Sequence, residues 1–180
     1  MITRKRNRLS DYDYSQYGVY FVTICTKERK NLFWVKDNIV GASIARPNDG
    51  YVLSDMGKIA EDGIKNIPQY YPVNIDCYVV MPNHVHILMG IVADGGRAML
   101  APTLSGAASQ CGGDVRNATS TLSNIVRQYK GYVTKKIGFS PWQKSFHDHI
   151  VRNRDEYLKI FEYIKTNPLK WNIDKYYTED

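Results

Sequence analysis

Cysteine and histidine are scarce in this chain, which has three cysteines and four histidines among its 180 residues. Cys25, Cys77 and Cys111 stand far apart, and no Cys-x-x-Cys pair occurs. An odd number of isolated cysteines predicts neither a disulfide framework nor a zinc knuckle. Because free thiols suit a reducing compartment, we expect a cytoplasmic protein.

Long hydrophobic runs are also absent. The amino end is basic and lacks the apolar region of an export signal, and Pro82, Asn83, His84 and His86 interrupt the most hydrophobic stretch. We therefore expect no export signal and no membrane span. Hydrophobic residues still make up 43% of the chain, which is enough to build a globular core.

Acidic residues are outnumbered by basic ones, 18 against 24, so the formal net charge is +6. The basic side chains gather at the amino end and along a later helix, and they are Arg4, Lys5, Arg6, Arg8, Lys130, Lys135 and Lys136. A polyanion is the natural partner of such clusters, because neutralised phosphates release counterions. A solvated basic surface explains the charge equally well. Exposed rings among the 14 tyrosines would favour unpaired bases, on which they stack.

Hydrophobic periodicity predicts the order of strands and helices. Strands are expected over residues 20–26, 32–35, 51–53, 73–81, 84–92 and 146–150, and helices over 56–67, 122–137 and 154–167. The first helix should end before Pro68, and the third should begin at an Asn153 cap and stop at Asn167-Pro168. This order fits a ferredoxin-like α+β sandwich, an antiparallel sheet with helices on one face.

Residues 93–119 carry Gly, Ala, Ser and Asn with little periodicity. Long loops of this kind are uncommon inside compact domains and are usually functional or disordered. We interpret the segment as a flexible linker within one domain that spans residues 1–180.

The most informative motif is His84-Val85-His86, two imidazoles separated by one hydrophobic residue. Alternate side chains of a strand share a face, so both histidines should project one way while Val85 and Ile87 face the core. Two imidazoles on one rigid strand can hold a divalent ion. A strand with two half-exposed histidines is the simpler explanation of so short a motif.

Tyr163 is the best nucleophile candidate on the third expected helix. At 100° per residue it falls at the edge of the apolar stripe, where a phenol can rest on the sheet and still meet a substrate. Asn167 lies one turn further on the same face, so it could supply an oxygen ligand to an ion held by the histidines. A packing role for Tyr163 and a helix-ending role for Asn167 before Pro168 are the alternatives.

Three segments in the same order resemble the REP-associated tyrosine transposases, a group of HUH-type single-strand DNA transposases. They are YVVMPNHVH from Tyr78, PWQKSFHDHIVRN from Pro141 and FEYIKTNPLKW from Phe161, and the opening YFVTICT from Tyr20 is similar as well. The likeness covers nearly the whole chain except the segment after Val92. It implies the ferredoxin-like fold, with His84, His86 and Asn167 as metal ligands and Tyr163 as the catalytic tyrosine.

The resemblance also implies a chemistry and a partner. Tyrosine attack on a phosphodiester forms a 5′-phosphotyrosine, which conserves bond energy for rejoining. A divalent ion, Mg²⁺ or Mn²⁺, would polarise the scissile phosphate. The expected substrate is single-stranded DNA folded into a hairpin, such as a REP-like element or an insertion-sequence end. The alternative is a non-catalytic hairpin-binding protein that keeps the fold and the basic surface.

Two residues stay as candidates for a secondary site. His149 could join the site or contact phosphate, or it could be a strand histidine bonded to backbone. Tyr129 resembles the tyrosine of more distant HUH transposases, but its place in the middle of an apolar stripe favours the core. The sequence leaves the oligomeric state open.

Overall fold

The structure is a computed structural model that describes residues 18–36, 50–92 and 121–178. Its elements are β1 Gly18–Cys25, η1 Lys27–Arg29, β2 Trp34–Lys36, β3 Tyr51–Leu53, α1 Asp55–Tyr70, β4 Val73–Met81, β5 His84–Ile91, α2 Thr121–Ile137, β6 His147–Val151, α3 Arg154–Thr166 and η2 Asn167–Ile173. The basic amino end, with Arg4, Lys5, Arg6 and Arg8, and the linker expected over residues 93–119 lie outside the described residues.

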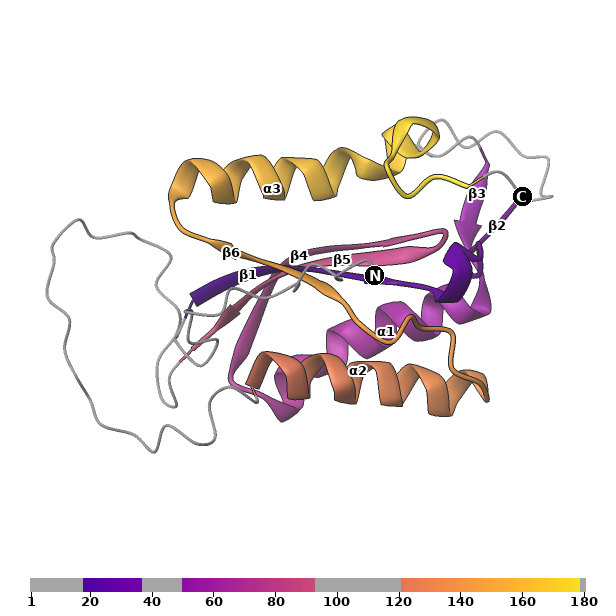
Figure 1. Ribbon diagram of the computed structural model, residues 1–180, viewed down its shortest axis with the longest axis horizontal. Coiled ribbons are helices and arrows are strands. Elements are labelled where there is room, and N and C mark those ends of the chain that lie inside the picture. The colour runs from indigo at the N-terminus through magenta and orange to yellow at the C-terminus, as the bar shows by residue number, and fades with distance from the viewer. Residues whose placement is uncertain (1–17, 37–49, 93–120, 179–180) are drawn as a thin grey trace, which may run out of the picture.

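Four strands form an antiparallel sheet in the order β4-β5-β1-β6, and β2 and β3 form a separate hairpin (Figure 1). β1 lies at the centre between β5 and β6, although 58 residues of sequence separate the end of β1 from the start of β5. With α1 and α2 in the two crossovers, this is the ferredoxin-like arrangement, so the predicted fold class is confirmed.

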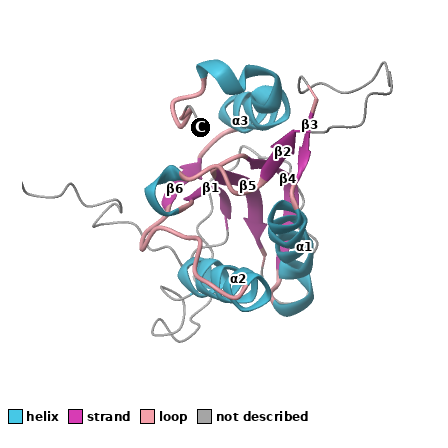
Figure 2. Ribbon diagram, turned by 90° about the vertical axis from the view of Figure 1, so that its right-hand side faces the viewer, coloured by secondary structure: helices cyan, strands magenta, loops and turns pink. Residues whose placement is uncertain are grey.

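The helices lie on both faces of the sheet. α1 and α2 cover one face together, whereas α3 lies on the opposite face (Figures 1 and 2). Between the sheet and the α1/α2 pair, the main core buries alternate strand residues such as Val22 and Ile87 against helix residues such as Ile64 and Ile125. The predicted helix layer is therefore formed by the first two helices, and the helix that carries Tyr163 packs on the other side.

The ends of α1 show one wrong prediction. The Ser54 side chain caps the helix by accepting a hydrogen bond from the Gly57 amide at 3.0 Å. The helix does not end before Pro68 but continues to Tyr70. Proline removes one donor near the end of the helix, and the Tyr71 amide still donates to the Ile67 carbonyl at 3.2 Å, so the last turn survives.

The Asn153 side chain caps α3 by accepting a hydrogen bond from the Glu156 amide at 2.9 Å. The helix runs to Thr166, as predicted, and Pro168 then opens the short 3₁₀ helix η2. This change of helix type turns the chain back over the sheet, and residues 174–178 pass beside the end of β5. The predicted α2 is also confirmed; it ends at Ile137 and is followed by Gly138, whose φ of +91° favours glycine.

None of the helices within the described ranges has the length and apolar character required to span a membrane.

Candidate active site

His84 and His86 occupy alternate positions of β5 and project from the sheet face that α3 covers. Both side chains are fully buried, at 0% exposure. Val85 and Ile87 point the other way into the main core, so the predicted division of this strand into two faces is confirmed. The neighbouring strand β1 pairs Thr23 with His86 across the sheet.

The far side of each imidazole ring is held by a polar partner. Asn83 Oδ1 lies 2.9 Å from His84 Nδ1, and the Thr23 hydroxyl lies 2.8 Å from His86 Nδ1. Asn83 is itself oriented, because its amide donates to the Tyr176 carbonyl at 2.8 Å. Because Asn83 Oδ1 can only accept a hydrogen bond, His84 Nδ1 carries the proton and donates, which leaves the Nε2 lone pair of His84 directed into the site.

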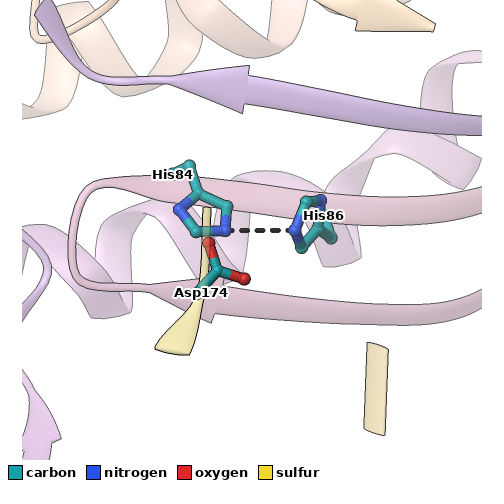
Figure 3. Close-up of side chains that lie close together, drawn as sticks. All are labelled: His84, His86 and Asp174. Carbon is teal, nitrogen blue, oxygen red and sulfur yellow. Dashed lines mark hydrogen bonds between the residues drawn. The ribbon is translucent and has the colours of Figure 1, made fainter. Parts of the chain in front are cut away.

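The two Nε2 atoms lie 3.1 Å apart, and Asp174 completes a cluster whose ligand atoms all fall within 4.8 Å of one another (Figure 3). Two nitrogens bound at about 2.1 Å to one ion, at right angles, would be about 3.0 Å apart. The spacing of the histidines and the mixed nitrogen and oxygen donors therefore fit a divalent cation.

Burial keeps the histidine pair uncharged. Desolvation lowers the pKa of His84 to about 3, and the charges of Lys175 and Arg29 act in the same direction while Asp174 opposes them. The pKa of His86 is also well below the ordinary value, first because of burial and then because of His84. Neutral imidazole is the form that binds a metal, so no proton has to be displaced at neutral pH.

Tyr163 reaches the same cluster from α3. Its hydroxyl donates to Asp174 Oδ2 at 3.2 Å and lies 3.4 Å from His86 Nε2. Burial and the Asp174 charge raise the pKa of Tyr163 to about 12, and the nearby Asn167 amide opposes this rise. The structure therefore brings the predicted nucleophile and both predicted histidines together around one carboxylate.

Asn167 lies one turn beyond Tyr163, as predicted, and is 1% exposed. Its side-chain amide lies near enough to the Tyr163 hydroxyl to act on it, but neither polar atom forms a hydrogen bond of good geometry within the described part of the chain. Buried amides almost always have hydrogen-bond partners. An amide without one, close to the cluster of His84, His86 and Asp174, therefore suits a site that takes up an ion or a substrate oxygen.

Sequence reasoning missed Asp174 and Tyr176. The Tyr176 ring packs on His84 with ring centroids 4.6 Å apart and is 6% exposed, so it closes the histidine pair from solvent. Asp174 Oδ1 accepts a hydrogen bond from the Tyr176 amide at 2.7 Å, which fixes the carboxylate. The only sequence signal was indirect: a carboxylate among aromatic residues shortly after the tyrosine helix.

The remaining predicted residues lie elsewhere. Lys135 and Lys136 are exposed on α2, on the sheet face opposite α3. Lys130 is partly buried and donates to the carbonyls of Gln143 at 2.8 Å and Ser145 at 2.9 Å, so its ammonium tethers the loop before β6. Tyr129 is 3% exposed in the main core and donates to the Ala60 carbonyl at 3.2 Å, which gives it a structural role away from the histidines.

Three known proteins are similar to this chain. An uncharacterized Haemophilus influenzae protein is 34% identical over 98% of this chain and 94% of its own length. A second protein of that organism, named "Putative REP-associated tyrosine transposase", is 22% identical over 90% of this chain and 77% of its own length. A solved REP-associated tyrosine transposase bound to a REP hairpin matches with a TM-score of 0.54 and 19% identity, over 90% of this chain and 74% of that chain. No protein-family model matches the chain.

The sheet order defines a ferredoxin-like α+β fold, which the solved REP-associated tyrosine transposase shares. The chain belongs to the family of the uncharacterized Haemophilus protein, and its predicted resemblance to the REP-associated tyrosine transposases is confirmed.

Proposed function

We propose that this chain is a metal-dependent single-strand DNA endonuclease and strand transferase that acts at DNA hairpins through a 5′-phosphotyrosine at Tyr163. In this proposal residues 1–180 form one HUH-type domain. The observation that carries it is the position of the Tyr163 hydroxyl, 3.4 Å from His86 Nε2 and 3.2 Å from Asp174 Oδ2. The fold shared with a solved REP-associated tyrosine transposase bound to a REP hairpin supports hairpin DNA as the substrate.

His84 and His86 would hold the ion, with oxygen from Asp174 or Asn167. When bound, Mg²⁺ or Mn²⁺ polarises the scissile phosphate and stabilises the leaving oxygen. The imidazoles are suited to this task because burial keeps them neutral and because Asn83 and Thr23 fix their orientation.

The covalent step follows from the Tyr163 hydrogen bond. The phenol oxygen attacks phosphorus, the bond from phosphorus to the 3′ oxygen breaks, and the phenol proton moves to Asp174 Oδ2, to which it is already donated. The released 3′ oxygen takes a proton from water, and the hydroxide left behind removes the proton from Asp174, so the carboxylate is regenerated. Attack by a 3′-hydroxyl on the phosphotyrosine reverses these bond changes and joins a DNA strand.

A denaturing gel tests the proposal directly. Labelled DNA hairpins with single-stranded flanks, incubated with the protein and Mn²⁺ or Mg²⁺, should become covalently attached. Tyr163→Phe should preserve folding and hairpin binding and eliminate the adduct. Tyr177→Phe, an exposed tyrosine near the site, is the matched control and should keep it. Peptide mapping that places the DNA on Tyr129, Tyr132 or Tyr176 would show that the assigned nucleophile is wrong.

One observation favours the alternative of a non-catalytic hairpin-binding protein. His84 and His86 have no exposed surface, and the Tyr176 ring lies over His84. A substrate phosphate can reach the histidines only if this cover moves. Tight hairpin binding with no adduct in either metal would favour the binding protein over the enzyme.

A further inference from the structure

A pocket of about 510 Å³, lined mainly by polar residues, opens beside the histidine pair. The sheet register explains its position. Thr23 pairs with His86 on one side and with His147 on the other, so these three residues form one row across β5, β1 and β6. The next pair, Phe21 and His149, lies on the same face of the sheet. The pocket therefore continues the candidate active site toward the β6 edge.

Two cations stand at this pocket, Arg29 and Lys175, and both are exposed. The Arg29 guanidinium lies 5.1 Å and the Lys175 ammonium 4.7 Å from the centroid of the Tyr176 ring, which itself packs on His84. Among residues 18–36, 50–92 and 121–178, no carboxylate forms an ion pair with either cation. Asp148 also lines the pocket, but it alternates with His147 and His149 along β6 and pairs with the core residue Val22, so its side chain is directed toward the other sheet face.

The backbone that presents Arg29 is strained. Glu28 and Arg29 have φ angles of +58° and +55°, in the left-handed region that residues with side chains rarely adopt. The Arg29 guanidinium donates to the Lys175 carbonyl at 3.2 Å, and the Arg29 carbonyl accepts a hydrogen bond from Asn83 at 3.2 Å. Strain of this kind persists where surrounding contacts fix it, and it is concentrated at functional sites.

We propose that the pocket formed by Arg29, Lys175, His147 and His149 is a subsite for one phosphodiester group of single-stranded DNA next to the scissile phosphate. Arg29 offers a planar set of donors that matches phosphate oxygens, and Lys175 adds a second charge. The histidines of β6 offer ring nitrogens from the sheet edge, although His149 Nε2 also contacts Glu156 at 2.6 Å. This subsite rests on the proposed function, because it positions the strand that Tyr163 would cut.

Binding of a labelled mixed-sequence single strand, measured by fluorescence anisotropy in EDTA at several salt concentrations, tests the subsite without the metal. The double variant Arg29→Gln/Lys175→Gln should bind more weakly, and the slope of log affinity against log salt should fall by about 0.7 for the lost phosphate contact. Arg29→Lys keeps the charge and the same backbone requirement, so its slope should match that of the original protein.

Lys58→Gln/Lys65→Gln is the charge-matched control, because both lysines are exposed on α1, on the opposite sheet face, where they pair with Asp55 and Glu61. A double variant that folds, by circular dichroism, but keeps the original slope would overturn the subsite. Failure of the proposed function is distinguishable: the original protein would then form no covalent DNA adduct, whatever the salt slopes. If the unmodified protein forms the adduct and the double variant keeps the original salt slope, the subsite is refuted and the proposed function stands.

Discussion

Acid should destabilise the metal-free protein through His84 and His86. Burial lowers the pKa of both histidines far below the value of 6.5 that they recover in the unfolded chain. Below pH 6.5 the two histidines bind protons in the unfolded chain but not in the folded chain, so the free energy of unfolding decreases as the pH falls. The effect is absent above pH 6.5 and grows until the pH reaches the folded pKa, about 3 for His84.

As long as the folded histidines stay neutral, the size of this loss of stability depends only on the histidine pKa in the unfolded chain. Between about pH 7 and about pH 5.5, each histidine should lower the free energy of unfolding by roughly 1 kcal/mol, and the pair by roughly 2 to 3 kcal/mol. The assay is urea unfolding in EDTA at the two pH values. The comparison is His84→Gln/His86→Gln, in which every other titrating group is retained and this part of the pH dependence should disappear.

Equal pH dependence in the two proteins would refute the reasoning. It would show that the histidines take up protons in the folded state, and hence that Tyr176 does not keep them from water. Saturating Mn²⁺ should restore stability to the original protein and not to the double variant, because a ligand that binds only the folded state adds to its stability.

Two further predictions concern the support of the site and the packing of the fold. Thr23→Val removes the hydroxyl that holds His86 and should weaken Mn²⁺ binding by about 10–100-fold, measured by calorimetry; unchanged affinity would show that the hydroxyl does not orient the ring. Gly57→Ala places a methyl group 2.2 Å from the Phe33 carbonyl oxygen and should destabilise the protein by about 1–3 kcal/mol. Gly131→Ala, a helical position with open space around it, should instead stabilise by about 0.5–1 kcal/mol, and opposite signs in thermal unfolding are the check.

The sequence predicted the fold well where local pattern determines the structure. The alternation around His84 placed two residues toward the site and two toward the core, and the Asn153 cap located the start of α3. The face on which α3 packs could not be predicted, because an apolar stripe shows that a helix packs and not against which side of a sheet. The end of α1 was predicted wrongly at Pro68, because a proline destabilises a helix little when it lies in the last turn.

The candidate site was predicted in part. Tyr163 and Asn167 follow from helical spacing, and His84 and His86 from strand spacing, so each pair is a local feature. Asp174 has no fixed spacing to either pair, because it lies after the change from α3 to the 3₁₀ helix. Only the folded chain shows that this turn returns a carboxylate to the histidines.

The hydrogen bonds of the site join distant parts of the sequence, and this affects when the site can exist. Thr23 and His86 are 63 residues apart, His86 and Tyr163 are 77 apart, and Asn83 and Tyr176 are 93 apart. Contacts of such range form slowly and late in folding. During synthesis, a ribosome-bound chain can pair β1 with β5 and still lack the tyrosine, the carboxylate and the ring that covers His84. A partly synthesised chain therefore cannot assemble the candidate site.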